Sequence, residues 1–326
     1  MGTSAAIADA RYTQVQTIAR GVVGAVQGLW GDVSADRILS AMQGQTGRLI
    51  LNAVIAGQLS AAQGAQAFVT GAMLAQGAGV EAVTTLNPGS LAGIAMDGRP
   101  LATLLYLPAI TTAQGLQIGM SPELAMARGL AQMSMLVAST VTDTARTGTS
   151  VAMTAEPRCY GYVRVVKAPA CSRCIILAGR QYTHSQGFKR HPKCDCGMEP
   201  MSQREWHERA DTQSPDELFK SMSPEERRKR FGIAGAEALE QGADMSQVVN
   251  ARRGMTTTTT GKKVTSEGTT KRGIGGKALD SGFQTAPGEK RARAREARLM
   301  PEQILKQADG NRELQIALLR KHGYIS

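Results

Sequence analysis

The sequence has few aromatic residues and few cysteines, and it lacks long apolar runs. Aromatic side chains make up 4% of its 326 residues, whereas hydrophobic residues make up 42%. The chain can therefore bury a core, and the shortage of aromatic residues favours close-packed helices over a β-sandwich. No uninterrupted apolar run reaches the roughly 18–20 residues of a membrane span, so we expect no membrane partner.

The sequence also shows no export signal and none of the common catalytic motifs. The amino-terminal stretch lacks a basic segment followed by an apolar one. The sequence has no GxSxG, no phosphate-binding loop and no HExxH. These absences leave the cysteine-rich segment as the one candidate for enzyme chemistry, and they indicate that the thiols stay reduced.

The net charge of +11 comes entirely from the second half of the chain. Residues 1–150 carry seven basic and seven acidic side chains, and residues 251–299 carry twelve basic against four acidic ones. This imbalance predicts a partner of opposite charge, such as nucleic acid, an acidic protein surface or a membrane surface, with nucleic acid favoured over membrane. The alternative is a solvated basic tail that only aids solubility. The candidate nucleic-acid-binding residues are Arg252, Arg253, Lys262, Lys263, Lys271, Arg272, Lys290, Arg291, Arg293 and Arg295.

Local signals predict the secondary structure. Ser34 and Ser121 are candidate N-caps, Pro122 suits a first helical turn, and Gly148 suits a helix end. The stretch CYGYVRVVKA, from Cys159, is typical of a strand. Further helix signals are the capping box of Ser223 and Glu226, Pro301 as a start, Asn311 as a cap and Gly323 as an end.

These signals predict a mainly α protein with a small α+β cysteine/histidine module, clipped by zinc, and a flexible basic segment. The expected organisation is a helical domain over 1–150, the cysteine/histidine module with following helices over 151–253, a flexible basic linker over 254–299 and a helical segment over 300–326.

The cysteine segment offers five candidate metal ligands. A Cys-x2-Cys pair precedes a His-x2-Cys-x-Cys ending, a spacing that suits a structural zinc site with three or four thiolates. The candidate ligands are Cys171, Cys174, His191, Cys194 and Cys196.

Two other interpretations of this segment remain open. Cys171 or Cys174 is a candidate nucleophile, with His191 or His184 as its base. A nucleophile needs one cysteine, however, and the others would then have no role. Alternatively the thiols are buried without a metal. Cys159 lies outside the pattern and is expected to be a half-buried strand residue.

The order of residues across this segment resembles the phage Mu F-like minor head proteins of actinobacterial tailed phages, which are often labelled capsid maturation proteases. The residues that carry the resemblance are Gly161, Tyr162, Val163, Arg164, Val165, Pro169, Cys171, Cys174, Leu177, Ala178, Arg180, Tyr182, Phe188, His191, Cys194, Cys196 and Pro200.

The resemblance implies a virion protein of the capsid interior, made in the host cytoplasm and located near the portal. It implies a structural role in capsid assembly and in DNA packaging or ejection, with the portal protein and the major capsid or scaffold protein as partners. The alternative that it implies is a cysteine-dependent maturation protease, for which Cys171 or Cys174 with His191 is the catalytic set to test.

Overall fold

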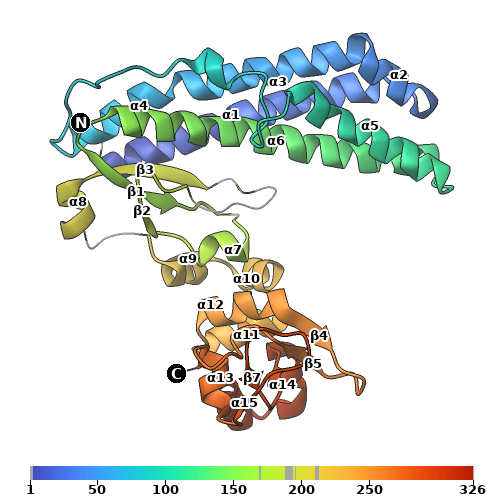
Figure 1. The fold of residues 1–326 in the computed structure, drawn as a ribbon, viewed down its shortest axis with the longest axis vertical. Helices are drawn as coiled ribbons and strands as arrows, with labels where there is room; N and C mark the ends of the chain where they lie inside the picture. Colours follow the sequence, from blue (N-terminus) through green and yellow to red (C-terminus); the bar gives the residue numbers. More distant parts are fainter. Residues whose placement is uncertain (1–2, 169, 188–193, 195, 210–212, 326) are drawn as a thin grey trace. The chain divides into compact units, whose positions relative to one another are not determined.

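The structure is a computed structural model, and it forms two compact units (Figure 1). It describes residues 3–168, 170–187, 194, 196–209 and 213–325. The first unit comprises Met1–Lys167 and Gly179–Thr212, and the second comprises Ala168–Ala178 and Gln213–Ser326. The predicted fold class is confirmed, because the described chain is mainly helical with small sheets and a buried cysteine cluster.

Long helices make up most of the first unit. In chain order its α-helices and 3₁₀-helices (η) are α1 (Ser4–Gly31), η1 (Ala35–Arg37), α2 (Ile38–Gln43), α3 (Gln45–Gln63), α4 (Ala65–Ala75), η2 (Pro88–Leu91), α5 (Leu101–Gln117), α6 (Pro122–Ala155) and α8 (Gln203–Glu208). Helix α6 packs against α1, α3, α4 and α5, which run beside it (Figure 1). Its start is as predicted, because the Leu124 N–H donates to Ser121 Oγ and Pro122 follows the cap.

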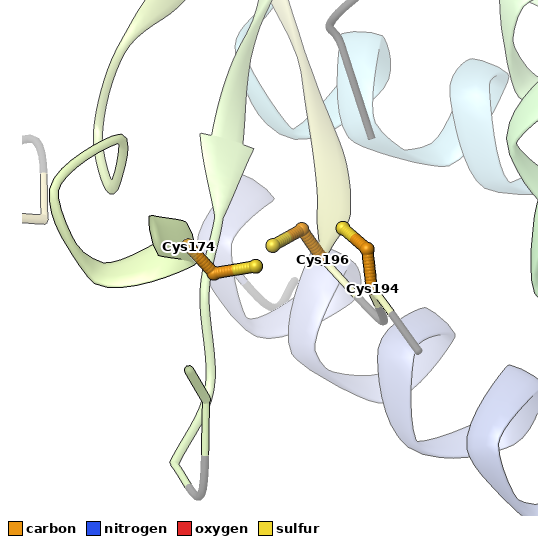
Figure 2. Close-up of side chains that lie close together, drawn as sticks. All are labelled: Cys174, Cys194 and Cys196. Carbon is orange, nitrogen blue, oxygen red and sulfur yellow. The ribbon is translucent and has the colours of Figure 1, made fainter. Parts of the chain in front are cut away.

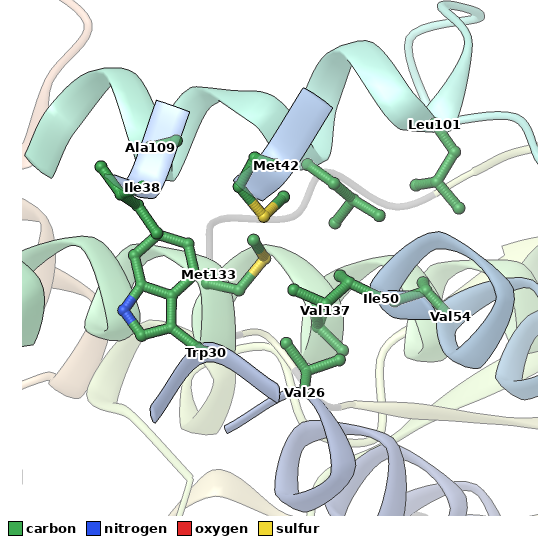
Figure 3. Packing of buried hydrophobic residues seen from close by; sticks show 11 residues of the cluster. Val26, Trp30, Ile38, Met42, Ile50, Val54, Leu101, Ala109, Met133 and Val137 are labelled. Carbon is green, nitrogen blue, oxygen red and sulfur yellow. The ribbon is translucent and has the colours of Figure 1, made fainter. Parts of the chain in front are cut away.

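The main apolar core of the first unit lies where these helices meet (Figure 3). Trp30 and Met133 are fully buried at its centre. The remaining buried members are Val26, Ile38, Met42, Ile50, Val54, Leu101, Leu105, Ala109 and Val137. Met133 and Val137 of α6 both belong to this core, as side chains four residues apart on one face of a helix can.

Two helix boundaries differ from the sequence prediction. Helix α6 does not end at Gly148 but continues to Ala155. Gly148 is buried, and a Cβ there would lie 3.3 Å from the Ala65 Cβ and 3.6 Å from the Ala62 Cα. The glycine thus permits close helix packing and does not end the helix. Ser34 precedes the short η1, and its side chain makes no capping hydrogen bond.

A three-stranded antiparallel sheet completes the first unit. It is made of β1 (Cys159–Val165), β2 (Gln181–Thr183) and β3 (Gly197–Ser202), in the order β2-β1-β3. The strand predicted from Cys159 is confirmed as β1. Strand β3 packs against α1 and α4, and Gln76 at the end of α4 donates to the Pro200 carbonyl and accepts from the Ser202 N–H.

The second unit combines short helices with two small sheets. Its elements are α7 (Ser172–Ile175), α9 (Pro215–Ser221), α10 (Pro224–Phe231), α11 (Ile233–Glu240), α12 (Met245–Ala251), η3 (Arg252–Gly254), β4 (Met255–Thr257), β5 (Lys263–Thr265), α13 (Ile274–Leu279), β6 (Phe283–Gln284), β7 (Arg293–Ala294), β8 (Arg298–Leu299), α14 (Pro301–Ala308) and α15 (Arg312–Lys321). The capping box at Ser223, the start at Pro301 and the cap at Asn311 are confirmed.

The segment 254–299 is part of this unit, where the sequence predicts a flexible linker. It contributes the strands of both small sheets, ordered β4-β5-β8 and β6-β7. Its few apolar residues are supplemented by buried polar ones, chiefly Thr265, Thr269 and Arg298. Arg298 is 1% exposed and donates hydrogen bonds to the carbonyls of Glu267, His322 and Gly323. Polar contacts with distant residues therefore order a segment whose composition suggests flexibility.

Among the described residues, α6 alone is long and apolar enough to cross a membrane, judged by length and composition. The central helix of a folded domain meets the same criteria. Because α6 is packed against four other helices of the first unit, its apolar side chains already serve a protein core.

Candidate metal centre

Three of the five cysteines bring their sulfur atoms together (Figure 2). The Sγ atoms of Cys174, Cys194 and Cys196 all lie within 4.8 Å of one another. The three side chains are buried. Four thiolates around a zinc ion at about 2.3 Å would lie about 3.8 Å apart, so a small contraction of this cluster would enclose an ion.

Cys174 reaches the cluster through a single helical turn. Cys171 precedes α7, and its carbonyl accepts hydrogen bonds from the N–H groups of Cys174 and Ile175. The segment that carries α7 leaves β1 and returns before β2. The Gly179 N–H donates to the Arg164 carbonyl, and the Arg164 N–H donates to the Arg180 carbonyl. These two hydrogen bonds join the ends of the loop that carries α7.

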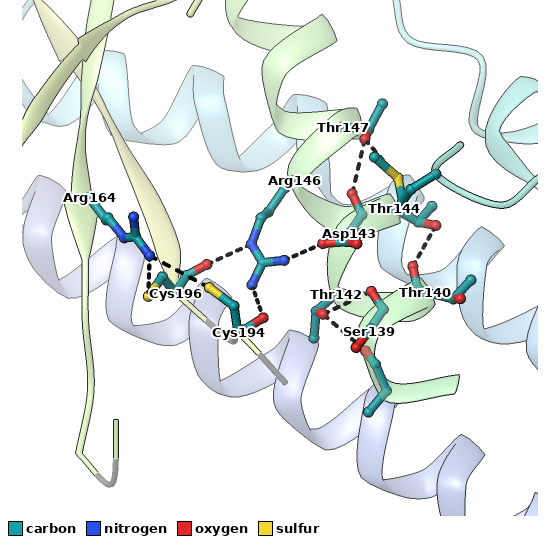
Figure 4. Close-up of polar contacts among 12 residues, drawn as sticks. Ser139, Thr140, Thr142, Asp143, Thr144, Arg146, Thr147, Arg164, Cys194 and Cys196 are labelled. Atoms are coloured by element: carbon teal, nitrogen blue, oxygen red, sulfur yellow. Dashed lines mark hydrogen bonds and ion pairs between the residues drawn. The ribbon is translucent and has the colours of Figure 1, made fainter. Parts of the chain in front are cut away.

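Arg146 of α6 holds the backbone at Cys194 and Cys196 (Figure 4). Its Nε donates to the Cys196 carbonyl at 2.8 Å and its Nη2 to the Cys194 carbonyl at 2.5 Å. Its Nη1 makes an ion pair with Asp143 Oδ1 at 2.5 Å. Because Arg146 is 8% exposed, these charge-assisted hydrogen bonds are shielded from water and fix the positions of both cysteines relative to α6.

Arg164 of β1 contacts the sulfur atoms themselves (Figure 4). Its Nη2 lies 3.3 Å from Cys196 Sγ and 3.6 Å from Cys194 Sγ. The side chain is 2% exposed. These contacts place a buried positive charge beside the sulfur atoms, where it would offset the negative charge of a thiolate-bound metal ion.

The donor set determines which ions suit the cluster. Thiolates prefer zinc and other soft or borderline metals, whereas Mg²⁺ and Ca²⁺ prefer oxygen ligands. Three thiolates and a divalent ion carry a net charge of −1, which the buried Arg164 would neutralise. The cluster therefore has the ligand chemistry, the burial and the charge balance of a structural metal centre.

The structure separates the predicted ligands into three groups. Cys174, Cys194 and Cys196 form the cluster, and Cys171 is half-buried and is not one of its members. His191 lies outside the described residues. His191 is also the candidate base for Cys171 or Cys174, so the geometry of that candidate catalytic pair lies outside the described residues.

The remaining histidine and cysteine candidates lie elsewhere. His184 is exposed and lines a separate cleft with Tyr160 and Arg204. Cys159 is buried in β1, and burial raises the pKa of its thiol to about 12. Such a thiol stays protonated at neutral pH and is a poor nucleophile.

Sequence reasoning assigned no role at the site to Arg146 or Arg164. A signal for Arg164 exists, because it is flanked by Val163 and Val165 in the most apolar strand of the chain. A charged side chain between apolar residues of such a strand indicates a buried partner. Arg146 has no comparable signal, because its acceptors are backbone carbonyls about fifty residues further along the chain.

The ten candidate nucleic-acid-binding residues lie in the second unit, and nine of them are exposed. Arg293 is half-buried, with its guanidinium donating to Glu289 and to the Ser266 carbonyl. Arg252 donates to the Phe231 carbonyl and lies 3.8 Å from a Glu302 carboxylate oxygen. Arg293 and Arg252 therefore have structural partners, which reduces the charge that they offer to a ligand.

Comparison with known proteins gives one match. Residues 117–223 match the VG15 protein family, which is about a third of the chain. The matched range contains α6, the three-stranded sheet and all the cluster cysteines. No curated protein and no solved structure matches the chain.

Proposed function

We propose that the chain is a minor head protein of a tailed phage, in which a structural zinc ion stabilises the cysteine module. The observation that carries this proposal is the buried cluster of Cys174, Cys194 and Cys196. These cysteines are also among the residues that resemble the Mu F-like minor head proteins, and they lie inside the range that matches the VG15 family.

Zinc is the metal that this donor set favours. It binds thiolates and imidazoles in four-coordinate structural sites, and such ions contribute directly to folding. Three ligands are supplied by the cluster. The fourth is expected from Cys171, three residues before Cys174, or from His191, three residues before Cys194. A bound ion would add stability to that of the apolar residues buried in the module, such as Tyr162, Ile175 and Met201.

The charge distribution supports a location inside the head. The second half of the chain carries the whole net positive charge, and most of the candidate basic residues are exposed. Packaged double-stranded DNA is a polyanion that such residues would contact through phosphates, without choice of sequence. The electrically neutral first 150 residues are the part proposed to contact the portal protein and the major capsid or scaffold protein.

The metal is tested by elemental analysis of the full chain purified without chelator. One zinc ion per chain is expected, and Cys196→Ser should lose it. Cys159→Ser is the matched control, because Cys159 is an equally buried cysteine outside the cluster. Wild-type protein that carries no metal would contradict the zinc centre.

The location is tested in the phage that encodes the chain. Mass spectrometry of purified virions should detect the protein at low copy, and a nonsense mutation in its gene should reduce the yield of DNA-filled particles. Absence of the protein from virions would contradict the proposal.

The same experiments distinguish the protease alternative. A cysteine protease predicts that Cys171→Ser or Cys174→Ser leaves the fold intact and blocks the cleavage of head proteins. A structural metal centre predicts that Cys174→Ser lowers the thermal stability of the sheet and loses the metal. Uncleaved head proteins in virions assembled with a stable Cys174→Ser variant would favour the protease.

A further inference from the structure

A second site lies in the first unit, on residues that the metal centre does not use. It is an open cleft of about 760 Å³, a volume within the range of small-ligand sites. Four separate stretches line it: 76–78, 157–160, 183–185 and 202–204. The sheet order β2-β1-β3 explains how they meet, because the last three stretches lie at the start of β1, the end of β2 and the end of β3.

The charge of this cleft is of one sign. Its charged residues are Arg158 and Arg204, and none of the described residues that line it carries a carboxylate. Glu205 lies 3.5 Å from Arg204, but it does not line the cleft, and an ion pair whose side chains are 60% and 28% exposed is weak. Glu156, which interacts with Arg158, does not line the cleft and is 2% exposed. Its burial raises the pKa of its carboxyl group, although the Arg158 backbone and charge act in the opposite direction. The cleft is therefore suited to an anion.

The cleft also presents an aromatic surface and hydroxyl groups. The Tyr160 ring is 40% exposed and lines the cleft. The Trp206 ring meets it edge-on, with centroids 5.2 Å apart, which fixes its orientation. Thr183, Ser185 and Ser202 add neutral hydrogen-bonding groups to the lining. Arginine side chains next to an aromatic ring can bind a nucleic acid, because the arginines contact phosphate groups and the ring stacks on a base.

We propose that this cleft binds a short segment of single-stranded nucleic acid, with phosphates contacting Arg158, His184 and Arg204 and a base stacking on Tyr160. The proposal is independent of the minor head function. That function assigns contact with double-stranded DNA to basic residues of the second unit, whereas the cleft is formed by the first unit alone. An exposed ring beside the cations favours a strand whose bases are unpaired, because paired bases in a duplex are not free to stack on it.

The probe is a short oligothymidylate that carries a fluorescent label and one 5-iodouracil, bound to the full chain. Photo-cross-linking followed by peptide mass spectrometry should identify Tyr160. Fluorescence anisotropy should show binding at least roughly tenfold weaker for the double variant Arg158→Gln/Arg204→Gln, and roughly fivefold or more weaker for Tyr160→Ala. Tyr160→Phe should bind as the wild type does, because it keeps the ring.

Arg128→Gln is the matched control, because Arg128 is an exposed arginine of the first unit that does not line the cleft. Its affinity should be unchanged. Arg204 also donates to the Gln76 carbonyl, so Arg158→Gln alone serves if the double variant unfolds early. Cross-links that map only to residues 251–299 would overturn the proposal. Equal affinity of the cleft variants and wild type would overturn it too, as would complete displacement of the oligonucleotide by polyglutamate at equal charge concentration.

Discussion

Both units bury arginine side chains, but they give them different acceptors. In the first unit, Arg164 donates to the sulfur atoms of two cysteines, and Arg146 donates to the carbonyls of the same two residues. In the second unit, Arg298 donates to three carbonyls and to Gln247 Oε1, and its guanidinium lies 4.2 Å from the centre of the Tyr324 ring.

The two sets of acceptors differ in whether their own charge can change. Carbonyls and a ring satisfy a guanidinium without changing their own charge, so the surroundings of Arg298 have one stable state. Sulfur atoms change charge with protonation and with metal binding, so the surroundings of Arg164 depend on what the cysteines hold. The contacts of Arg298 tie the C-terminal residues to the fold, whereas those of Arg146 and Arg164 position the cysteines of the cluster.

The largest expected effect is the loss of the Arg298 contacts. Arg298→Leu leaves the carbonyls of Glu267, His322 and Gly323 without this donor, and we expect the second unit to lose about 3–5 kcal/mol of unfolding free energy. Hydrogen exchange at the amides of α14 and α15 measures this loss locally. Arg312→Leu is the control, because Arg312 is exposed on α15, and equal effects of both substitutions would refute the comparison.

Acidification from pH 7 to pH 4 should lower the unfolding free energy of the second unit. The two backbone carbonyls that accept from Arg146 do not titrate in this range. Burial lowers the pKa of His322 to about 4, against about 6.5 in an unfolded chain. Between these values the unfolded state binds the proton that the folded state excludes. Stability from this group is therefore complete above pH 6.5 and is lost as the pH falls towards 4, by about 3 kcal/mol in all.

The structural reason is the hydrogen bond from the Leu299 N–H to His322 Nδ1, which needs an unprotonated nitrogen. Denaturant unfolding of the full chain between pH 7 and pH 4 checks the slope. His322→Gln should flatten it, and a slope that survives this substitution would assign the effect to another group.

The arginine beside the sulfur atoms should act on metal affinity. Arg164→Gln removes the positive charge and the donors to Cys194 and Cys196, and we expect zinc to bind 10–100-fold more weakly, as for other residues that support metal ligands. Competition with a chromophoric chelator measures the affinity. Arg164→Lys keeps the charge and should retain part of it, whereas unchanged affinity in Arg164→Gln would show that Arg164 has a packing role alone.

The smallest effect concerns the chain end that Arg298 holds. Gly323 has φ +65°, and a Cβ there would lie 3.0 Å from the Gly275 Cα and 3.1 Å from the Ala278 Cβ. Gly310 also has a positive φ, +80°, but a Cβ there would meet nothing within 4 Å.

We therefore expect Gly323→Ala to cost about 2 kcal/mol and Gly310→Ala about 1 kcal/mol. The difference between the two variants isolates the crowding at the C-terminal residues. Thermal unfolding of the two variants measures it, and identical costs would show that the chain end can shift.

Local features of the fold follow from the sequence because their causes are local. The start of α6 at Ser121 and Pro122, the capping box at Ser223 and the strand β1 depend on neighbours within a few residues. The mainly α class with a small cysteine module follows in the same way from periodicity and spacing.

The site could be predicted only as a set of five candidate ligands. Spacing places Cys171 and Cys174 one turn apart, but tertiary packing decides which of them joins Cys194 and Cys196. The burial of Arg298 could not be predicted from the sequence either, because its acceptors lie between 24 and 51 residues away along the chain. Composition alone therefore predicted a flexible segment where long-range polar contacts build a fold.

The contacts of Arg146 give the cysteine site an order of assembly. A chain leaves the ribosome from its N-terminus, so α1 to α6 are synthesised before Cys194 and Cys196 emerge. The helices can fold first, and the ion pair of Arg146 and Asp143 then holds the guanidinium that later binds the two cysteine carbonyls. The two cysteines then dock their backbone on it, so the part of the cluster that Cys194 and Cys196 form is built after α6.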